Sequence, residues 1–279
     1  MKKLLFASVM LALVQFASFG QTSAGQYKAR FQRQVKNLGV TGVGVETILD
    51  AWGRDFPQDG DMLEGRYAFY LAKSQGSEVV ERSERKYLGL KPVLELKDSL
   101  GTPHYYYQVA TYADSLFALS ASSIESAISL YPDELKYRID KITALCAYER
   151  ESPDMTEAEL LALIERNCTK PSWTFEGQPQ DDEFFQSIIQ EYCRNIFSLG
   201  TPRAYEVFLN VSQKMSKLYP KCAVYLSNVG SYWFVAQNNP KKATSFYKKA
   251  LKLDPEDFAA TRNLKLIQSL QSRKGQSSK

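Results

Sequence analysis

Histidine is almost absent from this sequence, since His104 is the only one among 279 residues. A catalytic triad that uses histidine would depend on that residue alone, and no G-x-S-x-G motif or phosphate-binding glycine loop accompanies it. Asp59-Gly60-Asp61 with Glu64 is the one acidic cluster of motif-like spacing. It lacks the further ligands of a calcium loop and fits a turn before a helix. We therefore expect no enzyme, no cofactor and no metal.

Long hydrophobic runs are also lacking, because no stretch approaches the roughly 18 apolar residues of a membrane-spanning helix. The N-terminus has two lysines, a short apolar run at Leu4–Val14, and Ser18-Phe19-Gly20 before Gln21. This pattern predicts a cleavable signal peptide at residues 1–20, with an uncleaved anchor as the alternative. We expect an exported mature chain, periplasmic or extracellular, with no transmembrane segment.

An excess of charge of either sign is lacking too. The chain has 35 basic and 31 acidic residues, and loss of Lys2 and Lys3 with the signal peptide would leave 33 against 31. Binding to a polyanion normally leaves a strongly basic footprint. We therefore expect no nucleic-acid partner.

Cysteines are few and lie in the second half of the chain. None has the C-x-x-C spacing of a metal site. An exported chain allows disulfides, and four cysteines permit three complete pairings, so the pairing stays open. Burial as free thiols is the alternative for the two that lie in apolar-periodic runs, Cys146 and Cys193. The other two are Cys168 and Cys222.

Apolar residues at helical spacing are what the chain has in abundance. Asp61-x-x-Glu64 and Thr156-x-x-Glu159 have the form of capping boxes, and Asp181-Asp182-Glu183 suits a helix N-terminus. The spacing predicts helices over residues 27–38, 45–52, 61–71, 79–88, 115–130, 135–145, 156–164, 184–199, 204–218, 223–237, 241–253 and 258–270.

Two segments do not have the helical pattern. Residues 91–97 alternate apolar and polar side chains, residues 98–101 have turn chemistry, and residues 103–107 have high β-propensity. We predict a β-hairpin insertion around 92–108, within 91–110, with His104 exposed on a strand. Residues 168–181 contain two prolines and a glycine and are predicted to be a loop.

Proline follows four of the predicted helices, at Pro57, Pro132, Pro220 and Pro255. The last two are 35 residues apart, close to a 34-residue helix-turn-helix period. The earlier intervals are 75 and 88 residues, each two periods plus an excess that falls at the hairpin or the loop. The spacing indicates an internal repeat of helix pairs.

The last unit resembles the tetratricopeptide repeat family, most clearly over residues 221–271. An earlier unit keeps Ser120, Ile124, Ala127 and Pro132. In the last unit, Ser227 and Gly230 depart from the family pattern. The resemblance implies an all-α solenoid of stacked helical hairpins that ends in a capping helix at 258–270. The positions that match the structural motif are Ser231, Phe234, Ala243, Tyr247, Ala250 and Pro255.

The same resemblance implies a groove lined by the first helix of each pair. Some family members hold a peptide carboxylate with lysine, arginine and asparagine, but only Asn228, Arg262 and Asn263 occupy comparable places here, without the lysines. The lysines at 241–252 are predicted to lie on the solvated side of an amphipathic helix, with contact with an anionic surface as the alternative. The residues expected to bind a partner in the groove are Tyr225, Asn228, Tyr232, Val235 and Arg262.

Taken along the chain, the sequence predicts a signal peptide (1–20), a helical region of true or divergent repeats (21–90), the hairpin, repeats over 111–272 and a flexible tail (273–279). We expect a non-catalytic scaffold that binds protein or peptide in a bacterial envelope, and the Ser-Phe-Gly/Gln cleavage region resembles Bacteroidetes exports. An accessory glycan-binding protein of a polysaccharide-uptake system is the alternative. Its candidate aromatics are Tyr105, Tyr106, Tyr107, Trp173 and Phe175.

Overall fold

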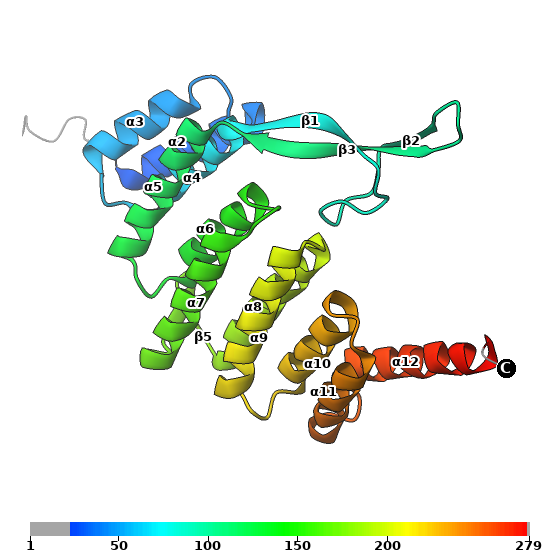
Figure 1. Cartoon of the computed structure of the whole chain (residues 1–279). Helices are drawn as coiled ribbons and strands as arrows, with labels where there is room; N and C mark the ends of the chain where they lie inside the picture. The colour runs from blue at the N-terminus through cyan, green and yellow to red at the C-terminus, as the bar shows by residue number, and fades with distance from the viewer. Residues whose placement is uncertain (1–22, 278–279) are drawn as a thin grey trace, which may run out of the picture. The chain divides into compact units, whose positions relative to one another are not determined.

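The computed structural model describes residues 23–277, so the predicted signal peptide lies outside the described residues (Figure 1). The described chain divides into two compact units. Unit 1 contains the residues up to Ser74 together with Asp114–Tyr131, and unit 2 contains Gln75–Ala113 together with the residues from Pro132 onward.

Unit 1 is a cluster of helices: α2 (Ala24–Leu38), α3 (Val45–Asp55), α4 (Gly60–Ser74) and α5 (Asp114–Leu130). Tyr27 of α2 stacks on Trp52 of α3 at 6.3 Å between ring centroids, and its hydroxyl donates to Asp55 at 2.6 Å. Ser120 of α5 is buried and donates to the Tyr67 carbonyl of α4 at 3.0 Å. A small residue at this position lets α5 approach α4 closely.

Unit 2 begins with a three-stranded antiparallel sheet of β1 (Gln75–Arg82), β2 (Leu94–Lys97) and β3 (Pro103–Tyr112), in the order β1-β3-β2. The predicted hairpin is confirmed as β2 and β3. The helix predicted over 79–88 is wrong, because residues 75–82 form β1 and pair with β3 over its full length. Adjacent Val79 and Val80 favour a strand, and the partner that fixes it lies far along the sequence.

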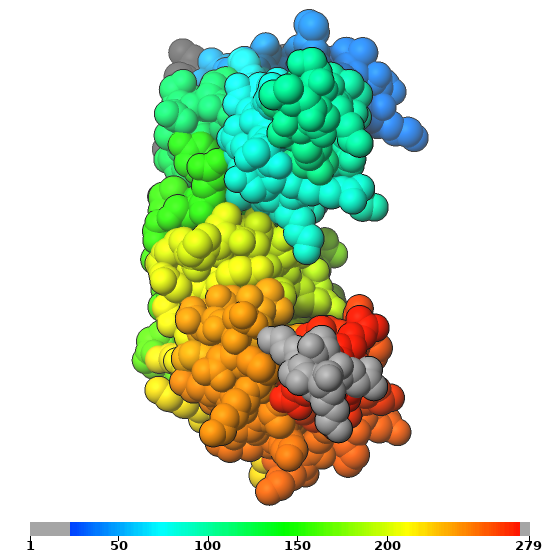
Figure 2. Space-filling view, turned by 45° about the vertical axis from the view of Figure 1, so that its right-hand side comes forward, coloured from blue at the N-terminus to red at the C-terminus, as the bar shows by residue number. Residues whose placement is uncertain are grey.

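The rest of unit 2 is a series of helical hairpins (Figure 1). Figure 2 shows the α10–α11 pair in orange against the α8–α9 pair in yellow, and α9 contacts α10. The fold is an all-α, tetratricopeptide-like solenoid with a small β insertion. The helices are α6 (Leu135–Tyr148), α7 (Asp154–Thr169), α8 (Asp182–Leu199), α9 (Pro202–Leu218), α10 (Ala223–Ser231), a π-helical turn (Tyr232–Ala236), α11 (Pro240–Leu253) and α12 (Phe258–Ser277).

The segment predicted as an irregular loop at 168–181 contains a second, short hairpin. Its strands are β4 (Trp173–Phe175) and β5 (Gln178–Gln180), joined by Glu176 and Gly177, both with positive φ. Glu134 holds this hairpin to the start of α6 by accepting hydrogen bonds from the backbone N–H groups of both turn residues. The segment therefore forms an ordered part of unit 2, held to the start of α6.

The last repeat shows why the motif positions carry small and aromatic side chains. Ala243, Tyr247 and Ala250 of α11 are fully buried, and the Tyr247 ring lies directly over Gly230 of α10. A Cβ atom at residue 230 would lie 2.7 Å from the ring. The Tyr247 hydroxyl lies 3.1 Å from the Ser231 hydroxyl and accepts from Asn263 of α12 at 2.9 Å. This tyrosine thus joins three helices.

All four proline-marked helix ends are confirmed, but both predicted capping boxes are wrong. α4 begins one residue before Asp61, and Asp59 caps it by accepting from the Met62 N–H at 3.2 Å. α7 begins before Thr156, which is buried and donates to Glu149. Short-range sequence patterns cannot show that a residue outside the helix takes the capping role. The helix N-terminus predicted at Asp181-Asp182-Glu183 is confirmed, and the Asp181 carboxylate caps it by accepting from the Phe184 N–H at 2.8 Å.

Candidate functional site

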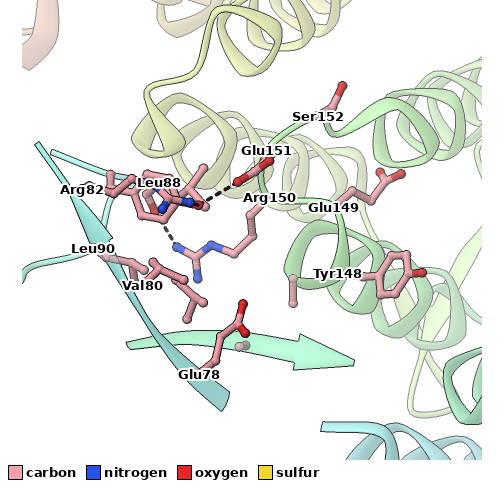
Figure 3. Close-up of a pocket in the computed structure, with 14 residues that line it drawn as sticks. Glu78, Val80, Arg82, Leu88, Leu90, Tyr148, Glu149, Arg150, Glu151 and Ser152 are labelled. Carbon is pink, nitrogen blue, oxygen red and sulfur yellow. Dashed lines mark hydrogen bonds between the residues drawn. The ribbon is translucent and has the colours of Figure 1, made fainter. Parts of the chain in front are cut away.

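A hollow of about 400 Å³ lies in unit 2, between the sheet and the turn that joins α6 to α7 (Figure 3). Strand β1 supplies alternate residues to it, because successive side chains of a strand point to opposite faces. The end of α6 and the following turn form the facing wall. The lining residues are Glu78, Val80, Arg82, Tyr87, Leu88, Leu90, Val109, Ala110, Ala147, Tyr148, Glu149, Arg150, Glu151 and Ser152.

A tight turn at residues 87–90 closes one side of the hollow. Leu88 is buried and has a φ of 49°, an unusual value for a side chain of this size, and Gly89 has a φ of 68°. Arg150 donates to the Leu88 carbonyl at 2.6 Å. A Cβ atom at residue 89 would lie 2.6 Å from the Ser198 carbonyl oxygen, so the turn packs against the end of α8. Contacts from the α6–α7 turn and from the end of α8 thus hold this turn in place.

Tyr87 links the two walls. Arg82 of β1 lies over its ring at 4.4 Å and donates to its hydroxyl at 2.9 Å. That hydroxyl donates in turn to Glu151 at 2.7 Å. Burial, followed by the hydrogen bond to Glu151, raises the pKa of Tyr87. The Arg82 guanidinium and the Glu151 carboxylate are therefore both engaged within the wall.

The hollow contains three carboxylates and two guanidinium groups. Glu149 is occupied, because it accepts from the backbone N–H groups of Met155 at 3.0 Å and Thr156 at 2.7 Å at the start of α7. Glu78 has no hydrogen-bond or ion partner in the part of the chain that the structure describes. Arg150 extends from the turn toward the strands, with its Nε buried and without a hydrogen-bond partner among the described residues (Figure 3). Unused hydrogen-bonding capacity therefore remains on both walls.

Ser152 is the serine that lines the hollow, and its hydroxyl donates to Asp154 at 2.7 Å. No histidine is among the lining residues. Across residues 23–277, no group of three histidine, cysteine or acidic side chains could hold a metal ion. The described helices also include none that is both long and apolar enough to cross a membrane.

The residues predicted to line a groove are not all at the surface. Tyr225 is fully buried and donates to the Gln186 carbonyl of α8 at 3.2 Å, and Tyr232 is also buried. Asn228 is buried and exchanges hydrogen bonds with Gln190 of α8, at 2.8 and 3.3 Å. Partner contact through these three side chains is thus contradicted by their burial. The physical reason is that α8 packs on the face of α10 that a single hairpin would expose.

Val235 and Arg262 are exposed, as the groove prediction requires. Val235 is in the π-helical turn, and the Arg262 guanidinium lies 6.0 Å from the centroid of the exposed Phe258 ring. Asn263, the third residue compared with a carboxylate clamp, donates to Tyr247 instead. Binding by Val235 and Arg262 stays a prediction.

The aromatics considered for glycan binding are largely covered. Tyr107 is fully buried and donates to the Glu84 carbonyl at 2.9 Å. Trp173 is buried and stacks on Phe185 with an interplanar angle of 2°. Neither ring can stack on a sugar in this structure. The other three, Tyr105, Tyr106 and Phe175, are half-buried.

His104 lies on strand β3, as predicted, on the sheet face away from the hollow, and it is half-buried rather than exposed. Its Nδ1 lies 2.6 Å from Glu81 and its Nε2 lies 3.6 Å from Asp98. The hydrogen bond to Glu81, followed by the nearby Asp98 carboxylate, raises the pKa of His104. The histidine therefore joins β1 to the β2–β3 turn.

All four cysteines are free thiols in the structure. Cys193 is buried as a free thiol, which was the alternative to a disulfide, and burial raises its pKa to about 12. Cys146 is half-buried with its pKa raised to about 11 by the same cause. Cys222 is also half-buried, whereas Cys168 is exposed.

Comparison with known proteins adds little to this geometry. No family model matches the chain, and no curated protein matches its sequence. Among solved structures, the chain is similar to YrrB, described as a TPR protein with an unusual peptide-binding site. The similarity covers 87% of this chain and 92% of that chain, with 12% identity and a TM-score of 0.40. Because the identity and the TM-score are low, the fold assignment rests on the helical hairpins of this chain itself.

The hollow was missed from the sequence because its first wall, β1, was interpreted as part of a helix. Adjacent valines after Gly76-Ser77 were the available signal for a strand. The second wall, formed by the end of α6 and the turn after it, was not predicted because Glu149 and Arg150 show no motif spacing. Their proximity to β1 is a tertiary contact between segments about 70 residues apart.

Proposed function

We propose that this chain is a non-catalytic scaffold that binds a protein or peptide partner through unit 2, in a bacterial cell envelope. The observation that carries the proposal is the hollow, whose walls present an unpartnered Glu78 carboxylate and an incompletely bonded Arg150 guanidinium. Polar groups left without partners gain hydrogen bonds when a ligand arrives.

The stacked hairpins support a scaffold, because neighbouring pairs bury a continuous core and leave a broad outer surface for recognition. Exposed Val235 and Arg262 belong to a second surface that we propose extends the contact with the partner. The predicted signal peptide supports export, and the envelope location depends on it.

A site-specific photo-crosslinker tests where the partner binds. We would place benzoylphenylalanine at Ser152, which is exposed at the rim of the hollow, and at exposed Lys248 on α11 as the matched control. In living cells, the probe at 152 is expected to crosslink a protein or peptide that the probe at 248 does not. Equal crosslinking from both positions, or none from 152, would contradict the proposed site.

Export is tested separately by fractionation and N-terminal sequencing of the expressed chain. We expect a soluble envelope form that begins at Gln21. A chain that retains Met1 in the membrane fraction would favour the anchor and contradict cleavage.

A further inference from the structure

Strand β1 forms an edge of the sheet. It pairs with β3 along all eight of its residues, and its other edge has no strand partner among the described residues. In an antiparallel pair, about half of the residues point their N–H and C=O groups away from the partner strand. Residues 75–79 are all exposed. A row of backbone donors and acceptors is therefore available for a further strand.

The hollow lies along the same strand, on the face that carries Glu78, Val80 and Arg82. A segment added to the free edge of β1 would point alternate side chains to this face. Strand addition of this kind takes affinity from main-chain hydrogen bonds and specificity from pockets for alternate side chains. The free edge of β1 offers the main-chain hydrogen bonds, and the hollow offers a pocket for a side chain.

The charges in the hollow identify the side chain that fits. Carboxylates outnumber guanidinium groups by three to two, and Arg82 and Arg150 already donate to Tyr87 and to the Leu88 carbonyl. Glu78 is the one charged group in the hollow without a partner in the described part of the chain. A basic side chain would neutralise this excess, whereas an acidic one would increase it.

The apolar part of the wall suits the same side chain. Val80 and Val109 line the hollow from the sheet, and Ala147 lines it from α6. Lysine and arginine bury their aliphatic stems against apolar surface while the charged head reaches a polar partner. The stem of such a residue would pack on these three side chains with its head at Glu78.

A second copy of the chain fits less well. Two-fold pairing of β1 with itself, in the registers that overlap most, brings Glu78 or Glu81 of one copy opposite or diagonal to a glutamate of the other. Like charges in cross-strand positions are destabilising. β1 has no lysine, and its one arginine is bonded to Tyr87.

We propose that the free edge of β1 binds an extended segment of a partner protein by strand addition, with a lysine or arginine side chain inserted into the hollow opposite Glu78. This inference rests on the proposed function, because it names how the scaffold takes its partner.

Synthetic peptides test the inference on the mature full chain. Three fluorescein-labelled pools of octapeptides would share random Val, Ile, Thr and Tyr at seven positions and carry Lys, Glu or Gln at the fifth. By fluorescence anisotropy, the lysine pool is expected to bind at least tenfold more tightly than the glutamate pool. Equal binding of all pools, or binding of none, would overturn the inference. The best lysine peptide, made again with alternate amides N-methylated, should lose binding, because methylation removes the strand hydrogen bonds.

Two glutamates of β1 give a matched pair of variants. Glu78→Gln should weaken the lysine peptide about tenfold, and Glu78→Lys should shift preference to the glutamate pool. Glu81→Gln changes a carboxylate of the same strand on the opposite face, where it contacts His104, and should leave affinity unchanged. Glu78 has no partner to lose, so thermal melting should confirm that its variants fold. Equal effects at 78 and 81 would contradict insertion into the hollow.

Hydrogen exchange separates failure of this inference from failure of the proposed function. Amides of residues 75–82 should become protected when the lysine peptide binds. If the crosslinker at Ser152 captures a partner but peptide binding protects only residues 223–273, strand addition is wrong and the scaffold function stands. If neither a crosslink nor peptide binding is seen, the proposed function itself is wrong. Protection of β1 that depends on protein concentration without peptide would favour a second copy and overturn the inference.

Discussion

Gly230 is a position in the last repeat at which the absence of a side chain is required for packing. A glycine inside a helix lowers helix stability, so sequence reasoning treats it as a departure from the family pattern. In the structure, the Tyr247 ring occupies the space that a side chain would need, at 2.7 Å from a built Cβ atom. The small residue is therefore required by its contact with α11, and only the packed pair of helices shows this.

Gly230→Ala should destabilise unit 2 despite the better helix propensity of alanine. We expect a loss of about 1–3 kcal/mol in the free energy of unfolding, because overpacking forces the tyrosine ring or the helix to move. Urea denaturation followed by circular dichroism measures it.

The control is a double-mutant cycle with Tyr247→Leu, which removes the ring. In that background Gly230→Ala should cost much less, which gives a coupling energy of opposite sign to the single losses. Additive effects of the two changes would show that the close contact does not limit stability.

His104 offers a direct test of its own surroundings, since it is the only histidine and its NMR signals are unambiguous. Its pKa is raised above the ordinary value, near 6.5, first by Glu81 and then by Asp98. A raised pKa in the folded state means that the ion pair contributes stability fully below the ordinary value. That contribution is lost as the pH rises through the folded-state pKa.

Titration by NMR should therefore give a pKa above the ordinary value in the wild type. Glu81→Gln should move it back toward that value, and Glu78→Gln, on the other face of β1, should leave it unchanged. A wild-type pKa at or below the ordinary value would contradict the geometry around His104.

At the scale of elements, prolines and apolar spacing predicted nearly every helix and its end. Phe56-Pro57 and Tyr219-Pro220 follow α3 and α9 directly, because the residue before a proline is disfavoured in helical conformation. The strand β1 was not predicted, because its two valines gain strand character from β3, whose paired residues lie about 30 positions away. Local signals thus predicted helices, and the sheet depends on contacts that no local pattern contains.

The start of α7 provides a test of the same lesson. Glu149 precedes the helix by five residues, yet accepts hydrogen bonds from the Met155 and Thr156 N–H groups and from the Thr156 hydroxyl. Glu149→Ala should lower the free energy of unfolding by about 1–2 kcal/mol, as for other lost helix caps. Urea denaturation measures the loss.

Glu165→Ala is the control on the same helix. It removes an exposed ion pair with Lys214, for which we expect less than about 1 kcal/mol. An equal or larger loss at 165 than at 149 would show that the Glu149 contacts do not cap the helix.

At the scale of the whole molecule, the sequence predicted the fold class more completely than the site. The repeat positions Ala243, Tyr247 and Ala250 are all buried, as small and aromatic packing residues should be. The same regularity misplaced the groove, because Tyr225 and Tyr232 face a neighbouring hairpin that a single repeat unit does not show. In one repeat unit, residues that pack between repeats cannot be told from residues that remain at the surface. Only the stack of repeats shows which of them are buried.

Thiol reactivity reports on the assembled chain in one measurement. Cys168 is exposed, whereas the other three cysteines are at least half-buried, and burial raises the pKa of Cys146, Cys193 and Cys222. Because the thiolate is the reactive form, a native chain should show one fast thiol with a disulfide reagent, and urea should release four. Cys168→Ser should remove the fast phase and leave the other three unchanged. Fewer than four thiols in urea without reductant would reveal a disulfide in the exported protein, contrary to the free cysteines of this fold.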